Sequence, residues 1–217
     1  MPSFATPAPI TATLDFAAGR VHLAAGDRTD TTVDVRPADP TRNRDVEAAG
    51  RTTVTCADGV LTVHAPRGRN LGPSGAIAVT VALPSGSHVE AATAGAEFDA
   101  TGRLGAVTFF GAYHHIKLAE AGSVHLTATD GDIEIGRLDG PADISTARGD
   151  IRIADATRGT VRLTTRSGTI TVGAGVSATL EAETTHGRID NTLRNDGSPA
   201  LAIRATTSHG DIVAHAL

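Results

Sequence analysis

A glycine recurs at nearly constant spacing through the second half of this 217-residue chain, and the recurrence restricts the possible folds more than any other feature. Successive members are separated by 18, 19, 19 and 23 residues. The surrounding positions repeat as well, because an isoleucine stands two residues after each glycine and a small or β-branched residue stands three before. Such a repeat predicts a chain built from similar structural units. The five glycines are Gly131, Gly149, Gly168, Gly187 and Gly210.

The apolar, small and β-branched positions of each repeat alternate with a period of two, which is the pattern of a half-buried β-strand. They lie seven, five and three residues before the glycine and two and four residues after it, with Asn191 as the misfit. The step from three before to two after is odd, so a straight strand would place the two sets on opposite faces. Glycine permits the corner that keeps both sets inside, because it adopts positive φ without steric cost. Each repeat is therefore predicted to be a strand, a corner and a second strand.

Two short strands cannot bury their apolar face alone, so successive repeats have to stack on one another. The predicted fold class is all-β: a single-stranded β-solenoid, or β-helix-like stack, with rungs of about 18–20 residues. Neighbouring rungs of such a stack lie about 4.8 Å apart.

The first half of the chain contains short β-rich runs separated by turn residues. Asp58 and Gly59 stand between two such runs and predict a tight hairpin. The stretches 37–51 and 66–75 are expected to be loops. We expect residues 1–85 to form a region of N-terminal strands that caps or extends the solenoid, with a small sandwich as the alternative, and residues 86–217 to form the solenoid repeats.

Several segments, taken in their order along the chain, resemble a bacterial family of adhesin-like repeat proteins called toastrack domains. The resemblance covers nearly the whole chain. It implies stacked β-rungs and a loose association with bacterial envelope-stress systems, and it supplies no catalytic residue. The matching segments are 14–21, 59–63 and 81–87, together with the repeated Gly-Asp-Ile at 131–133, 149–151 and 210–212.

Composition argues against several classes of partner. The formal net charge is −5, whereas phosphate binding needs clustered positive charge, so no nucleic acid is expected. Aromatic residues make up 3% of the chain and there is no Trp, which argues against a stacking site for bases or sugars. The single Cys56 forms no intramolecular disulfide. Neither a secretory signal nor a long apolar stretch is recognisable, so the chain is expected to be cytoplasmic, without direct membrane insertion.

Polar residues beside the corner glycines are the candidate ligands for a cation. His186 and His209 precede two of the glycines and Asp211 follows one, so these three residues could form a two-histidine, one-carboxylate metal site. The alternative is that the histidines are solvated corner residues. Asp132 and Asp150 could likewise share a cation, or each could hydrogen-bond its own turn. The corner roles are the simpler interpretation, and no metal or cofactor is expected.

The sequence stops directly after the last repeat, which predicts an open edge formed by Ile212, Val213 and Leu217. An open rung invites another strand, so we expect a protein partner or self-association there. The predicted function is a non-catalytic interaction or scaffold protein of the adhesin-like type, not an enzyme. The alternative is a glycan-binding or glycan-active β-helix protein, which would need a carboxylate-lined groove with aromatic walls.

Overall fold

The computed structural model describes residues 1–66 and 74–217, apart from the side chains of residues 112–114. The chain divides into two compact units, unit 1 (residues 1–115) and unit 2 (residues 116–217), and the long strand β7 (His88–Ala128) contributes to both. The boundary expected after residue 85 was placed where the repeats begin in the sequence, whereas the two compact units are separated by their internal packing. The expected boundary therefore stays a prediction. Most of the stretch 66–75 lies outside the described residues.

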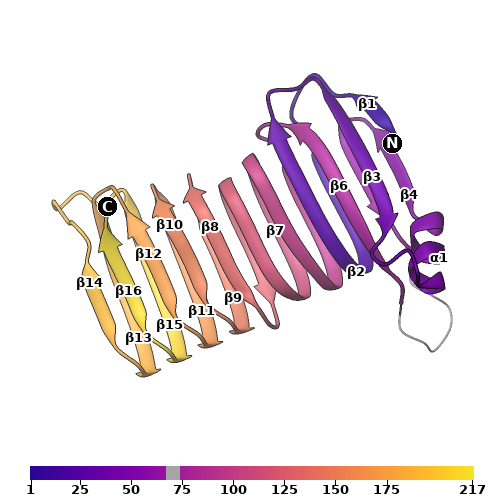
Figure 1. Ribbon diagram of the computed structural model, residues 1–217. Helices are drawn as coiled ribbons and strands as arrows, with labels where there is room; N and C mark the ends of the chain where they lie inside the picture. Colours follow the sequence, from indigo (N-terminus) through magenta and orange to yellow (C-terminus); the bar gives the residue numbers. More distant parts are fainter. Residues whose placement is uncertain (67–73) are drawn as a thin grey trace. The chain divides into compact units, whose positions relative to one another are not determined.

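Unit 2 consists of rungs, each made of two strands that meet at one of the five predicted glycines (Figure 1). All strand pairings between its rungs are parallel, as a solenoid requires, so the all-β solenoid prediction is confirmed. The end of β7 and β8 (Asp132–Leu138) form the first rung. The others are β9 (Ala142–Arg148) with β10 (Ile151–Ala156), β11 (Gly159–Ser167) with β12 (Ile170–Ala174), β13 (Ala178–His186) with β14 (Ile189–Thr192), and β15 (Leu201–His209) with β16 (Ile212–Ala216).

The corners explain why glycine is required. Gly149 has φ +128°, and an added Cβ would overlap the carbonyl oxygen of Gly131 on the neighbouring rung. The threonine three residues before several of the glycines strengthens the same corner, because its hydroxyl donates to the glycine carbonyl one rung away. Thr165 donates to Gly149 at 3.2 Å and Thr207 donates to Gly168 at 3.0 Å.

The rungs do not stack in the order of the sequence. Strand β15 pairs with β11 on one side and with β13 on the other, and β16 lies in the same way between β12 and β14 (Figure 1). The rung that comes last in the chain is therefore an internal rung of unit 2. The rung formed by β13 and β14 lies at the edge instead.

Unit 1 is also built from parallel rungs. Strand β2 (Thr11–Gly26) forms a two-part rung, and its neighbours in parallel are β7 on one side and β5 (Val60–His64) with β6 (Ala76–Pro84) on the other. Antiparallel strands then close the outer side: β4 (Thr53–Ala57) pairs with β5, β3 (Asp30–Pro37) pairs with β6, and β1 (Ser3–Ala5) pairs with β3. Within unit 1 the N-terminal strands thus both add parallel rungs and cap them with antiparallel strands.

The turn at Asp58 and Gly59 is the predicted hairpin, since both residues have positive φ and join β4 to β5. The expectation of a loop over residues 37–51 is wrong in part, because α1 (Asn43–Arg51) is a helix. Its buried Asp45 accepts a hydrogen bond from the main-chain N–H of Ala76 at 2.9 Å, which anchors the helix to the first residue of β6.

Candidate functional site

The three candidate metal ligands do not form a closed site. The rings of His186 and His209 stack at one corner, with centroids 4.8 Å apart and planes inclined by 5°. The Oδ1 atom of Asp211 accepts a hydrogen bond from the main-chain N–H of Arg188 at 2.8 Å. Within the described part of the chain, no three His, Cys, Asp or Glu side chains are grouped so that they could hold a metal ion. The imidazole pair is the feature that remains at this corner.

The aspartates that follow the corner glycines connect successive rungs. Asp132 accepts the main-chain N–H of Asp150 at 2.9 Å, and Asp150 accepts that of Thr169 at 2.7 Å. Each carboxylate therefore bonds the corner of the next rung, and not its own turn as the simpler interpretation held. These carboxylates therefore have a structural role, because they hold the corners of successive rungs together.

The predicted edge residues do not lie at an edge. Ile212 pairs with Ile170 and with Ile189, and its side chain is 1% exposed. Val213 pairs with Thr171 on β12 and with Asp190 on β14. Leu217 is 56% exposed, and its main-chain N–H donates to Ala174 at 3.0 Å. The prediction failed because it assumed that the last rung in sequence is also the last in space.

The free edge of unit 2 is formed by β13 and β14. In the described structure β13 pairs with β15 alone, and β14 pairs with β16 alone. Ile189 is consequently 47% exposed, although it belongs to the same isoleucine column as the buried Ile212. Leu180, Ala182 and Thr184 face inward on β13, yet each is only half-buried.

Main-chain groups along β13 are directed away from the stack. The carbonyl of Ser177 accepts hydrogen bonds from the rung of β15, whereas the N–H of Ala178 donates to Arg194 in the following loop at 2.9 Å. Because main-chain groups alternate in direction along a strand, the N–H and C=O groups of Leu180, Ala182 and Thr184 point outward. We call residues 179–186 the edge strand.

A shallow hollow lies on the outer face beside the edge strand, with a volume of about 420 Å³. Glu181 and Glu183 rise from the edge strand, and Arg204 on β15 forms an ion pair with Glu181 at 3.1 Å. No aromatic side chain is among the residues that line it, so it lacks the walls expected of a sugar-binding groove. The lining residues are Arg162, Thr164, Glu181, Ala182, Glu183, Arg204, Ala205 and Thr206.

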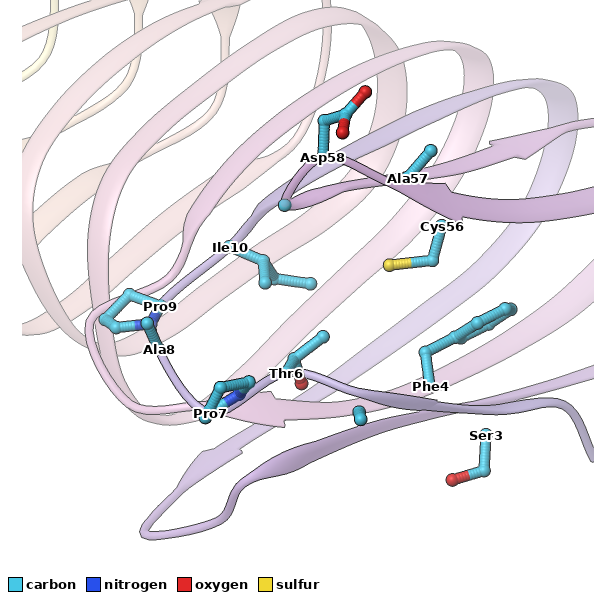
Figure 2. A pocket seen from close by; sticks show the side chains of 12 residues that line it. Ser3, Phe4, Thr6, Pro7, Ala8, Pro9, Ile10, Cys56, Ala57 and Asp58 are labelled. Atoms are coloured by element: carbon cyan, nitrogen blue, oxygen red, sulfur yellow. The ribbon is translucent and has the colours of Figure 1, made fainter.

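A second hollow of about 520 Å³ lies in unit 1 between the N-terminal segment and the hairpin of β4 and β5 (Figure 2). Figure 2 shows the side chains of Phe4, Ile10 and Cys56 directed into the same space, with Asp58 pointing away. Cys56 is a half-buried free thiol. The hydroxyl of Thr6 is hydrogen-bonded to that of Thr31 at 2.8 Å, and the walls combine polar and apolar groups with one thiol.

Sequence reasoning missed the edge strand, but two signals were present. Asn191 interrupts the apolar column four residues after the glycines, and it lies on the exposed strand β14. The separation of 23 residues before Gly210 contains the loop that crosses from the edge rung back into the stack. A polar residue in the core column and an extra-long connection both indicate a rung that is covered on one side only.

Parallel two-strand rungs with glycine corners place this chain among the open β-solenoid repeat proteins. The comparisons define the class further. The family model described as Toastrack DUF4097 matches residues 13–216, and the chain belongs to this family. No curated protein matches the chain.

One of the similar solved structures supports the fold. This structure is that of a putative adhesin from Bacteroides fragilis, which is 14% identical, with a TM-score of 0.50; the match covers 98% of this chain and 95% of that one. A second similar structure, that of a putative adhesin from Parabacteroides distasonis, is 13% identical, with a TM-score of 0.47 and the same shares covered. At sequence identities this low, structural similarity is evidence for the fold and not for the function. Among the helices of the described residues, none has the length and apolar character to cross a membrane.

Proposed function

We propose that this protein is a non-catalytic interaction scaffold that binds an extended strand of a partner along the edge strand of β13. The observation that carries the proposal is the contrast between Leu180 on β13, which is half-buried, and its register partner Ile203 on β15, which is 1% exposed. Adding one more strand would bury the half-exposed inward side chains of the edge rung. It would also pair the outward main-chain groups of Leu180, Ala182 and Thr184.

The absence of catalysis is part of the proposal. Asp132, Asp150 and Asp211 at the corners accept main-chain hydrogen bonds, and Glu181 is engaged by Arg204. Carboxylates used in this way hold rungs together and do not form a general acid and base pair. The proposed link to bacterial envelope-stress systems and the cytoplasmic location both derive from the sequence and its family resemblance.

The test uses peptides that form extended strands and a variant that blocks the edge. Three blocked peptides of about eight residues alternate Val with Arg, Val with Thr and Val with Glu. We expect at least one to bind the full-length protein by fluorescence anisotropy, and we expect Ala182→Pro to weaken that binding by about ten-fold or more, because the outward N–H is lost.

Ala182→Val is the matched control, since it enlarges the side chain but keeps the N–H. Proline at this position removes no bond to β15, so circular dichroism should show both variants folded. Equal peptide binding by wild type and Ala182→Pro would contradict the proposal, as would a wild type that binds none of the three peptides.

A further inference from the structure

We infer that the strand that docks on β13 is basic, with Lys or Arg alternating with aliphatic or small side chains. This inference rests on the proposed function and adds the chemistry of the partner. It follows from the way the chain itself pairs charges between neighbouring rungs.

Three arginines on the outer face of unit 2 meet an acidic residue directly across an adjacent parallel strand. Arg204 meets its register partner Glu181 at 3.1 Å, and Arg137 meets its register partner Asp155 at 2.7 Å. Arg162 lies 3.8 Å from Asp143, again its register partner. Opposite charges placed directly across a strand pair stabilise a sheet. Each of these three acidic residues thus meets an arginine on the neighbouring strand, although Arg162 and Arg204 also lie opposite each other across β11 and β15.

The edge strand carries an acid for which the chain provides no such match. Glu183 is exposed, its register partner on β15 is Thr206, and within the described residues it takes part in no ion pair. Glu181 points to the same face two residues earlier. No Lys or Arg stands between residues 178 and 186. The next strand of the ladder would therefore complement this edge with a positive side chain opposite Glu183.

The inward positions define the other half of the pattern. Leu180, Ala182 and Thr184 continue columns that are filled one rung inward by Ile203, Ala205 and Thr207. A docking strand would present an aliphatic, a small and a β-branched or aliphatic side chain to them. Basic residues then fall on the alternate positions, which face outward beside Glu181 and Glu183.

A second copy of this chain is a poor occupant of the same edge. If two edge strands paired antiparallel about Ala182, Glu181 of each copy would lie opposite Glu183 of the other. Like charges directly opposite each other destabilise a strand pair. The charge on the edge strand thus favours a basic partner over self-association.

The three alternating peptides separate the possibilities. We expect the Val–Arg peptide to bind about ten-fold or more tightly than the Val–Thr peptide, and the Val–Glu peptide to bind most weakly. The difference should shrink between about 50 mM and about 300 mM salt, because exposed charges are screened. Glu183→Arg should reverse the order of the Val–Arg and Val–Glu peptides.

Glu90→Arg is the matched control, since Glu90 is exposed on β7 in unit 1 and the change in charge is identical. It should leave the order of the peptides unchanged. If all three peptides bind equally and Ala182→Pro abolishes their binding, the inferred partner charge is wrong and the docking edge stands. If none binds, both proposals fail. A wild-type dimer in light scattering that Ala182→Pro dissociates would identify a second copy as the occupant and overturn the basic partner.

Discussion

The outer parallel rung of unit 1 and the outer rung of unit 2 are built alike but finished differently. In unit 1 the rung of β5 and β6 is covered by antiparallel β4 and β3, so Leu61 and Ile77 are fully buried. In unit 2 no strand of the described structure covers the outer side of β13 and β14, so Leu180 is only half-buried and Ile189 is exposed. The same repeat thus ends in a capped rung in unit 1 and in an uncovered rung in the described structure of unit 2.

The cap of unit 1 shows what closing an edge requires. The strand direction reverses at β3 and β4, which ends the parallel addition of similar rungs. Strand β1 beyond β3 is three residues long, and short edge strands are poor templates for further pairing. The chain therefore has the means to cap a stack, and the free edge of unit 2 is not imposed by the solenoid itself.

The largest expected effect is a difference in stability between substitutions in the internal rung of unit 2 and in its edge rung. Ile212→Ala should lower the free energy of unfolding by about 3 kcal/mol, because it leaves a cavity between packed rungs. Ile189→Ala makes the same chemical change at the exposed edge and should cost less than about 1 kcal/mol. Urea denaturation measures both. Equal losses would show that β14 is covered in solution and would remove the contrast between the two units.

A smaller effect is expected in the cap of unit 1. Asp45→Ala should destabilise the protein by about 2 kcal/mol, because it leaves the N–H of Ala76 without its acceptor. Asp45→Asn keeps an acceptor oxygen and should lose less. Glu47→Ala removes an exposed helix ion pair with Arg51 and should change stability by no more than about 0.5 kcal/mol. Thermal denaturation that ranks Glu47→Ala with Asp45→Ala would show that the helix is not anchored through Asp45.

The smallest effect concerns the loop that covers the start of β13. Hydrogen bonds from the Ser177 hydroxyl and the Ser198 main-chain N–H lower the pKa of Asp196 below its ordinary value. Because the folded-state pKa is depressed, this contribution to loop stability is present above the ordinary carboxyl pKa. It is lost as the pH falls through the lowered value.

Ser177→Ala should therefore raise the pKa of Asp196 toward its ordinary value, as measured by an NMR titration of the carboxyl group. The amide of Ala178, which donates to Arg194, should also exchange faster in that variant. Ser198→Ala keeps its main-chain N–H and is the control. An unchanged Asp196 titration in Ser177→Ala would mean that this hydroxyl does not hold the loop.

The rungs were predictable because side-chain parity and glycine spacing are local properties of the sequence. Their spatial order was not, because the two rungs that exchange places have interchangeable columns. Leu180 and Ile203 are both aliphatic, and each rung has alanine and then threonine at the next two inward positions, so either rung fits beside β11. Only the misfit Asn191 and the long loop distinguish them.

Helix α1 was not predicted from the sequence for a different reason. The segment from Asn43 to Arg51 has few apolar residues, and its Val46 is exposed, so it lacks the apolar stripe that identifies a helix in sequence. Its position depends on Asp45 meeting Ala76, a contact between segments far apart in the chain. Local patterns cannot indicate such a contact.

The insertion of β15 between β11 and β13 also sets the timing of folding. Strand β13 is synthesised before β15, yet β15 is its only partner strand in the described structure. During synthesis the sides of β11 and β13 that will contact β15 have no native partner until residues 201–209 emerge. Both strand edges are open to incorrect pairing in that interval. The last two rungs of unit 2 thus cannot pair natively in the order of the sequence, because β13 has no native partner until β15 is present.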